Sequence, residues 1–428
     1  MRPARTPVVP YSLSDTLMSS VHRQPIARAF LPLTAAVALT TIGVGALLPR
    51  SAHAQRPDSV GRVDTTRRAE APKPAEPAKT PQLDFSGVMF ANWSYRTDRG
   101  ARAQNRFDVE RAYLTFRMPA GERASVRITA DVFQNTTAPG DAFYRGWAFR
   151  AKYAYLQYDA LRGGSGLTAT ARLGMLQTVV IEHVESFWPR WISRSALELN
   201  GFFQSADLGL AAQVGLPGKR GEIYATVTNG PGYSARETDR FKDAAVRLTF
   251  TPFASGSGFL QGTAVSLWGY KGAIASRFVS GGAGQVGPVS EGLQRDRWGV
   301  FAGVRDRRLT VGAEYAARIE EGELGSNTVA SPRMLIDSTS TLVSAFALVR
   351  PLEIITPATR SPLAAIVRYD RARLNDDAGP AQRLIIAGLI WDLTSRLSMA
   401  ADYQQLLPRD GAPGAAVKTW FAHFVASF

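Results

Sequence analysis

The chain has 428 residues, of which 45% are hydrophobic and 20% are charged, and its formal net charge is +14. It contains no cysteine, which excludes a disulfide framework, a thiolate metal site and a cysteine nucleophile. The positive charges are mostly arginines scattered singly through alternating apolar segments, without a basic helix or a lysine tract. We therefore expect no nucleic-acid partner.

The N-terminal region carries the pattern of an export signal. An uncharged, mostly apolar run, Ala29–Leu48, follows two arginines and is followed by Ala-His-Ala at 52–54. This order predicts a secretory signal peptide over residues 1–54, with Met18 as an alternative start. The competing interpretation is a single membrane helix, which the run is long enough to form. The proline and two glycines within the run and the small residues after it favour the cleaved signal.

Residues 55–82 are rich in Pro, Ala, Lys and Glu and contain almost no large apolar side chain. Such a segment cannot bury a core, so we expect a disordered or polyproline II tether in the periplasm. We expect residues 83–428 to form the folded part of the chain, with an all-β structure.

Within residues 83–428, apolar and polar residues alternate with period two in sixteen segments separated by turn signals. The predicted strands are 83–96, 105–117, 122–134, 149–160, 167–177, 202–216, 220–228, 240–251, 259–271, 294–305, 308–320, 338–350, 362–374, 381–393, 395–406 and 417–428. An even number of antiparallel strands of this length predicts a transmembrane β-barrel of about sixteen strands.

The links between these segments differ in length. One set is short and predicts periplasmic turns, at 119–121, 217–219, 306–307 and 394. The other set is long and predicts external loops, at 135–148, 178–201, 229–239, 272–293 and 321–337. This alternation is expected of a membrane barrel and not of a soluble sandwich. The link 351–361 is long for a periplasmic turn.

Alternation also divides each strand into two faces. In the segment 122–134, Val126, Ile128 and Ala130 share one face, and Arg127 and Asp131 lie on the other. Alternation alone does not say which face is inside, since a soluble barrel would place the apolar face inward. The signal peptide, strand count and last residue favour lipid outside and charges in a wet lumen, because lipid-facing charge is costly.

Six arginines fall on the predicted inner face: Arg111, Arg127, Arg172, Arg247, Arg318 and Arg368. As a group they predict a pore wall that attracts anions. The alternative is that each pairs with a local carboxylate, such as Asp131, Asp243 or Glu314, and only solvates the lumen.

The long link 178–201 combines both charge signs with three bulky aromatic residues. It contains Glu182, Glu185, Arg190 and Arg194 beside Phe and Trp residues. Carboxylates and guanidinium groups facing each other would set a transverse field, so we expect a constriction loop inside the lumen. The alternative is an external lid with solvated charges.

The last segment, 417–428, ends on an aromatic residue. Trp420, Phe424 and Phe428 share its apolar face. A strand with a terminal aromatic looks like the closing strand of a bacterial outer-membrane barrel, whose end is read by the barrel-assembly machinery. The alternative is the last strand of a soluble sandwich.

No motif for catalysis or for a cofactor occurs. The chain has four histidines, none spaced as a metal pair, and it has no G-x-S-x-G sequence, no P-loop and no G-x-G-x-x-G after a strand. We therefore expect neither an enzyme nor a cofactor. One alternative function is a structural or adhesive barrel with a closed lumen. A barrel enzyme is a more remote alternative.

Several stretches together resemble the phosphate-selective porins of the O/P type, from Gram-negative outer membranes. They are FDVERAYLTFRMPAGERASVRITADV, KYAYLQYD, RLGMLQTVVIEHVESFWPRWISRS and NGPGYSARETDRFKDAAVRLTFTPF. The resemblance implies a sixteen-stranded trimeric barrel whose third external loop, here 178–201, folds into the lumen. The chain departs from the phosphate-specific members, because it has no dense ladder of inward arginines with a lysine cluster. The resemblance therefore does not carry phosphate specificity.

Together these features predict an outer-membrane porin, a passive diffusion channel for small hydrophilic solutes with a mild anion preference. Removing residues 1–54 leaves an excess of ten positive charges on the mature chain. The expected partners are outer-membrane lipid, small anions or other small solutes, the assembly machinery and two further copies of the chain.

Overall fold

The computed structural model describes residues 82–98, 104–134, 146–164, 166–276, 278, 292–325, 328–331, 333–375, 381–408 and 416–428. The predicted signal peptide and almost all of the predicted tether lie outside these residues. The folded unit falls within residues 77–428.

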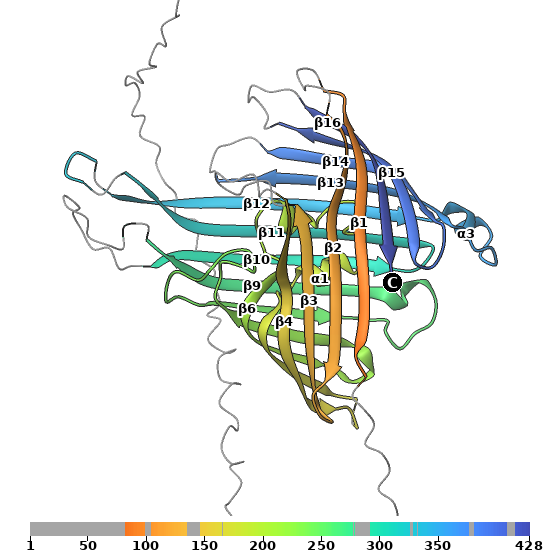
Figure 1. Cartoon of the computed structure of the whole chain (residues 1–428), viewed down its shortest axis with the longest axis horizontal. Helices are drawn as coiled ribbons and strands as arrows, with labels where there is room; N and C mark the ends of the chain where they lie inside the picture. The colour runs from red at the N-terminus through yellow and green to blue at the C-terminus, as the bar shows by residue number, and fades with distance from the viewer. Residues whose placement is uncertain are drawn as a thin grey trace, which may run out of the picture. The chain divides into compact units, whose positions relative to one another are not determined.

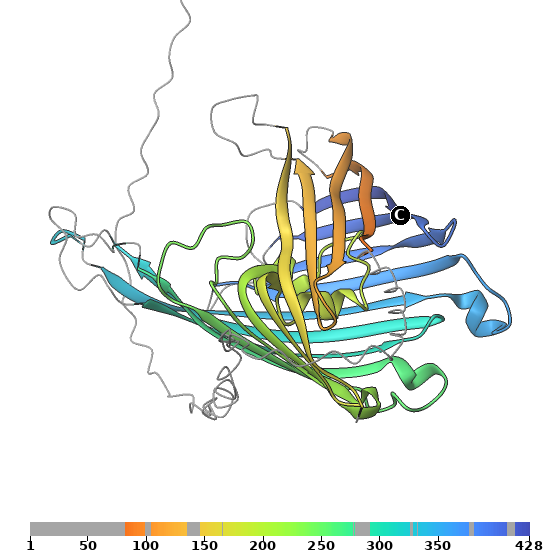
Figure 2. The same cartoon turned by 60° about the horizontal axis from the view of Figure 1, so that its bottom comes forward.

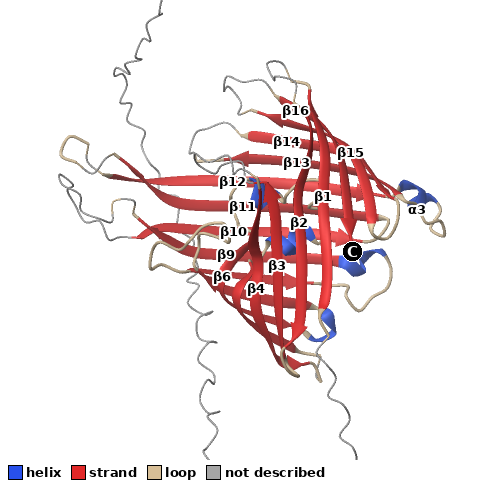
Figure 3. Cartoon of the chain, viewed as in Figure 1, coloured by secondary structure: helices blue, strands red, loops and turns tan. Residues whose placement is uncertain are grey.

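Sixteen strands make up nearly all of this unit (Figures 1 and 3). They are β1 Asp84–Arg96, β2 Asn105–Pro119, β3 Ala124–Gln134, β4 Trp147–Arg162, β5 Thr168–Gln177, β6 Ala206–Gly215, β7 Gly221–Thr228, β8 Asp243–Phe250, β9 Thr263–Ala275, β10 Gly292–Arg305, β11 Leu309–Leu324, β12 Met334–Val349, β13 Leu363–Arg373, β14 Gln382–Asp392, β15 Leu397–Leu407 and β16 Val417–Ser427.

The strands close into one barrel. Each strand pairs antiparallel with its neighbours in sequence, and β1 pairs with β16 to complete the ring. The predicted count of sixteen strands and the antiparallel barrel are confirmed. Closure leaves no strand edge unpaired, which is the condition for a β-structure in lipid.

The links alternate strictly between the two ends of the barrel, which we name the short-turn end and the long-loop end. The short-turn end carries the links after even-numbered strands, among them 120–123, 306–308 and 393–396. The longer link 350–362, which seemed out of place in the sequence, contains a helix, α3 (Pro351–Ile355). The carboxylate of Glu353 in α3 accepts hydrogen bonds from Arg307 and from the Ser361 backbone N–H, so this turn is a compact cap.

The outer face is apolar. On β13, Leu363, Val367 and Tyr369 point outward and are 47%, 49% and 41% exposed, whereas the alternate residue Arg368 is 1% exposed. Aromatic side chains gather on the outer face near both ends, with Tyr403 against Trp420 at the long-loop end and a further group at the short-turn end. Among the described residues, no helix is long and apolar enough to cross a membrane.

The terminal residue closes the barrel at its short-turn end. The backbone N–H of Phe428 donates to Gly87 of β1, and the N–H of Gly87 donates to Phe428. The Phe428 ring lies over Gly87 and next to Phe85, where a Cβ on Gly87 would collide with it. Phe428 therefore packs on the first strand.

The hydrophobic core lies inside the barrel. Part of the inner wall is apolar, which the expectation of charges in a wet lumen did not include: Leu342, Phe346, Ile366 and Ile386 point inward from β12, β13 and β14. These inward apolar side chains alternate with outward apolar ones, and the segment between β5 and β6 covers them from inside. Glycines make room for inward rings, since a Cβ on Gly299 would meet the ring of Trp268.

Candidate functional site

The segment between β5 and β6, residues 178–205, is the longest described link and is named here the inner segment. It contains two short helices, α1 (Ile181–Glu185) and α2 (Ala196–Leu199). Ser195 caps α2 by accepting a hydrogen bond from the Glu198 N–H, which explains where that helix begins. The Trp188 indole N–H donates to the Ser193 carbonyl at 2.7 Å and folds the segment back on itself.

Side chains from strands around the ring bind carbonyl oxygens of the inner segment. The pairs are Arg247 with Val179, Arg305 with Ser186, Gln404 with Ile192, Arg368 with Arg194, Arg318 with Gly201 and Arg297 with Phe202. The donors stand on β8, β10, β11, β13 and β15. A segment that touches all of these strands of a closed ring must lie inside it, and Figure 2 shows its helical turns between the strand groups.

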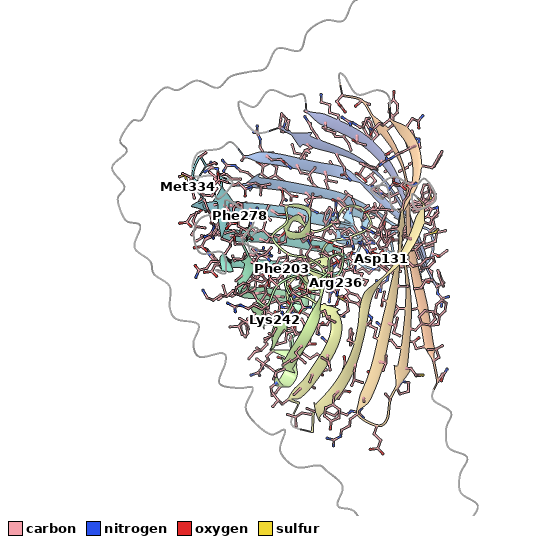
Figure 4. All side chains as sticks on the ribbon, turned by 60° about the vertical axis from the view of Figure 1, so that its left-hand side comes forward. Asp131, Phe203, Arg236, Lys242, Phe278 and Met334 are labelled. Carbon is pink, nitrogen blue, oxygen red and sulfur yellow. The ribbon has the colours of Figure 1, made fainter. Side chains whose placement is uncertain are left out.

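Aromatic packing holds the same segment against the apolar part of the wall. Trp188 is 1% exposed and packs on Phe346, with 5.4 Å between the ring centroids. Phe203 meets the edge of Trp268 at 5.2 Å. Figure 4 shows Phe203 among the side chains crowded around the inner segment, and Asp131 at the wall formed by the N-terminal strands. The inner segment is thus a packed part of the barrel interior.

The charges of the inner segment are arranged differently from the predicted transverse field. Arg190 pairs with Glu185 and with Glu198, so its positive charge is compensated within the segment and the three groups together keep one formal negative charge. Glu182 and Arg194 are exposed side chains of the same segment. Glu182 interacts with the Tyr153 hydroxyl on β4, which places its carboxylate toward the opposite wall.

All six arginines predicted to point inward do so, but their partners divide them into two groups. Four of them meet carboxylates, in the pairs Arg111–Asp131, Arg247–Glu222, Arg318–Glu320 and Arg368–Asp370. Among these, Arg247, Arg318 and Arg368 also anchor the inner segment. These three arginines therefore hold the inner segment in place, in addition to any effect of their charge on solutes.

The remaining two arginines, Arg127 and Arg172, have no carboxylate partner among the described residues. The guanidinium of Arg127 donates to Thr129 and lies 4.5 Å from the ring centroid of Tyr153. Arg172 donates to two glutamine side chains, at 3.0 and 2.8 Å. Both stand on strands near the short-turn end, across from α1. These two guanidinium groups keep their full positive charge toward the lumen.

Sequence reasoning missed Lys152, which is 4% exposed and donates to the Tyr113 hydroxyl at 3.2 Å. Strict alternation would place Lys152 and Tyr153 on opposite faces. A bulge in the pairing of β3 with β4, between Thr129 and Ala130, shifts the register and brings both residues inside. The charge of Lys152 inside an apolar run was the only available signal.

A cavity of about 410 Å³ lies between the inner segment and β6–β11 toward the long-loop end. Its wall includes Tyr270 and three arginines, Arg295, Arg297 and Arg318, each of which pairs with Glu320. Acidic and basic groups balance there, so this mouth of the barrel is polar with no dominant sign.

Comparison with solved structures places this architecture among porins. The chain is similar to an anion-selective porin from Comamonas acidovorans, with a TM-score of 0.56 and 10% identity over 82% of this chain and 100% of that chain. It is similar to OmpF of Salmonella typhi in complex with daunomycin, with a TM-score of 0.55 and 12% identity over 81% and 98% of the two chains. It is also similar to the outer-membrane channel DcaP of Acinetobacter baumannii, with a TM-score of 0.54 and 12% identity over 81% and 97%.

At the sequence level no protein-family model matches the chain, and no curated protein matches it either. The likeness therefore establishes the porin fold, a closed barrel of sixteen antiparallel strands. The narrower resemblance to phosphate-selective porins gains no support from these comparisons.

Proposed function

We propose that this protein is an outer-membrane channel through which small hydrophilic solutes diffuse passively. The observation that carries the proposal is the inner segment, anchored within a sixteen-stranded barrel whose outer face is apolar. An apolar outer face with aromatic side chains near both ends suits a bilayer. The N-terminal export pattern fits delivery to the outer membrane of a Gram-negative cell.

The narrow part of the channel, in this proposal, lies between α1 and the wall of β3 to β8. Arg127 lies over the ring of Tyr153 and Glu182 interacts with its hydroxyl, so both charge signs are present in this region. Charges at close quarters in a water-filled passage orient and select ions. The inner segment thus acts as the constriction, although Glu185 and Arg190 are neutralised within it and Arg194 contributes only an exposed charge.

A mild anion preference follows from Arg127 and Arg172, the two lumen arginines without a carboxylate partner among the described residues. Unpaired guanidinium groups lower the energy of a passing anion. The paired arginines, including Arg111, add little field. Phosphate-like anions belong to the solutes that such a channel would admit, with no dedicated phosphate site implied.

The test is a planar-bilayer recording on purified protein in a salt gradient. Replacing Arg127 and Arg172 with Gln should move the reversal potential toward the cation side, with the difference shrinking at 1 M salt, where the screening length is about 3 Å. The matched control replaces Lys219 and Arg220, exposed at the short-turn end, with Gln and should leave selectivity unchanged. A cation-selective parent would contradict the anion preference.

A closed structural or adhesive barrel is the second candidate, and one observation favours it. The inner segment forms a hydrophobic core inside the barrel, with Trp188, Leu197 and Phe202 at most 1% exposed. A barrel that folds, shows heat-modifiable mobility and conducts no ions would establish this alternative.

Assembly completes the proposal. We propose that β16 together with the following Phe428 is recognised by the barrel-assembly machinery, with Trp420 and Phe424 on the outward face of the strand. We further propose that the mature protein is a homotrimer. The exposed aromatic side chains of β16 and the porin fold support this. Deleting Phe428 should lower the yield of inserted barrel; normal yield and normal heat-modifiable mobility would contradict it. Cross-linking in membranes tests the trimer.

A further inference from the structure

The outer face of the barrel carries a group of positive charges where an apolar surface is expected. Arg371 and Arg373 stand on β13 at the long-loop end, on the same outward face as Val367 and Tyr369, and both are exposed. Their inward neighbours, by contrast, are buried. The alternation therefore places both guanidinium groups outside the barrel.

Neighbouring strands extend this group. Arg383 on β14 lies directly opposite Arg371 in the pairing register, on the same outer face. Lys418 on β16 is opposite Gln405 of β15, again on the outer face at the long-loop end. We name Arg371, Arg373, Arg383 and Lys418 the outer basic patch. Like charges directly opposite each other in a sheet are destabilising unless another charge compensates them.

Two members of this patch, Arg371 and Arg373, lack a compensating carboxylate among the described residues. Arg368 on the inner face of β13 pairs with Asp370, and the outward Lys271 of β9 lies 3.4 Å from Asp296 of β10. Arg371 and Arg373 form no ion pair with any described residue. The outward charges of Arg371 and Arg373 on β13 are thus left open to the surroundings, unlike that of Lys271.

The height of the patch along the barrel indicates what surrounds it. Tyr369, one outward position below Arg371, and the pair Tyr403–Trp420 on β15 and β16 form an aromatic group just on the short-turn side of the patch. Aromatic side chains of this kind mark the level where hydrocarbon meets lipid head groups. The patch then lies at the head-group level, where guanidinium groups bind phosphate with two parallel hydrogen bonds.

We propose that the outer basic patch is a binding surface for phosphate-bearing anionic lipid head groups in the leaflet at the long-loop end. This inference rests on the proposed membrane location and concerns the outside of the barrel, not its channel. Basic clusters next to the membrane boundary recognise anionic lipids by this chemistry.

The test is native mass spectrometry of the full-length purified protein in neutral detergent with equal amounts of phosphatidylglycerol and phosphatidylcholine. The parent should retain phosphatidylglycerol preferentially. Replacing Arg371 and Arg373 with Gln should weaken that retention by roughly 30-fold at low ionic strength, and less at high salt. Replacing both with Lys, which keeps the charge, should restore most of it.

The control variant replaces Lys219 and Arg220 with Gln, which removes the same charge at the other end of the barrel. Equal retention of the two lipids by the parent, or an equal loss of retention in the control, would overturn the proposal. A changed number of subunits with unchanged lipid retention would also overturn it, because the patch would then face another copy. Conductance is recorded for each variant: a conducting barrel without lipid preference refutes only this inference, and a non-conducting parent that keeps the preference refutes only the channel.

Discussion

Trp188 is the side chain on which the position of the inner segment depends most. It is 1% exposed, packs on Phe346 at 5.4 Å and lies under the guanidinium of Arg368 at 5.0 Å. Replacing a buried Trp with Ala costs about 3–5 kcal/mol. The barrel strands keep their own hydrogen bonds, so this loss falls mainly on the equilibrium between the docked and the released inner segment. Each 1.4 kcal/mol is a factor of ten, so release should become roughly 100- to 4,000-fold more frequent.

Limited trypsin digestion of the refolded protein measures this release, because Arg190 and Arg194 lie in the inner segment. In the parent, Arg190 is ion-paired and its side chain is only 10% exposed. Trp188→Ala should raise the rate of cleavage after Arg190 and make single-channel conductance larger and noisier. Trp391→Ala, on the outer face and 51% exposed, is the control and should change neither. Parent-like cleavage and conductance in a folded Trp188→Ala barrel would refute the packing argument.

Three further predictions concern other parts of the barrel. Gly87→Val should displace the Phe428 ring and lower the melting temperature; an unchanged melting temperature would show that the ring contributes nothing to closure. Deleting residues 182–194 should raise single-channel conductance well above the parent value, and unchanged conductance would remove the constriction role. The hydrogen bond from Arg96 lowers the pKa of Asp98, which also accepts from the Lys418 N–H. Asp98→Asn should therefore speed amide exchange at Lys418 at neutral pH. Because the pKa of Asp98 is lowered, the difference should vanish only when the pH falls well below the usual aspartate pKa of about 3.9; equal exchange at pH 7 would contradict this.

The strands were predictable because period-two alternation is a direct consequence of strand geometry. The segment around Arg127 and Asp131 shows this, since every inward and outward position was predicted correctly. Alternation fails where a bulge inserts a residue, as at Lys152, because a charge within an apolar run does not by itself tell at which residue the register changes. The helix at Pro351–Ile355 was also missed, and its link was therefore read as an anomaly in the turn pattern.

The inner segment was located from its length and composition, but its attachment was not predictable. Arg247, Arg318 and Arg368 were expected to attract anions, and they instead donate to main-chain carbonyls. A carbonyl acceptor is present at every residue, so sequence carries no signal for which one an arginine will bind. The apolar inner wall was missed for a related reason. In β14 both faces are apolar, so the alternation of residues does not indicate that the inner segment covers one of them.

The attachment of the inner segment through its carbonyl oxygens has a consequence for how the channel could change over evolutionary time. The wall arginines recognise backbone that every amino acid supplies, as at Ser186 and Gly201. Side chains of the segment that face the lumen, such as Glu182, can therefore be exchanged without loosening its hold on the wall. Solute preference and mechanical retention are thus encoded in separate atoms of one segment. Single substitutions in the segment can therefore change permeation, because they leave the contacts that hold the segment in place intact.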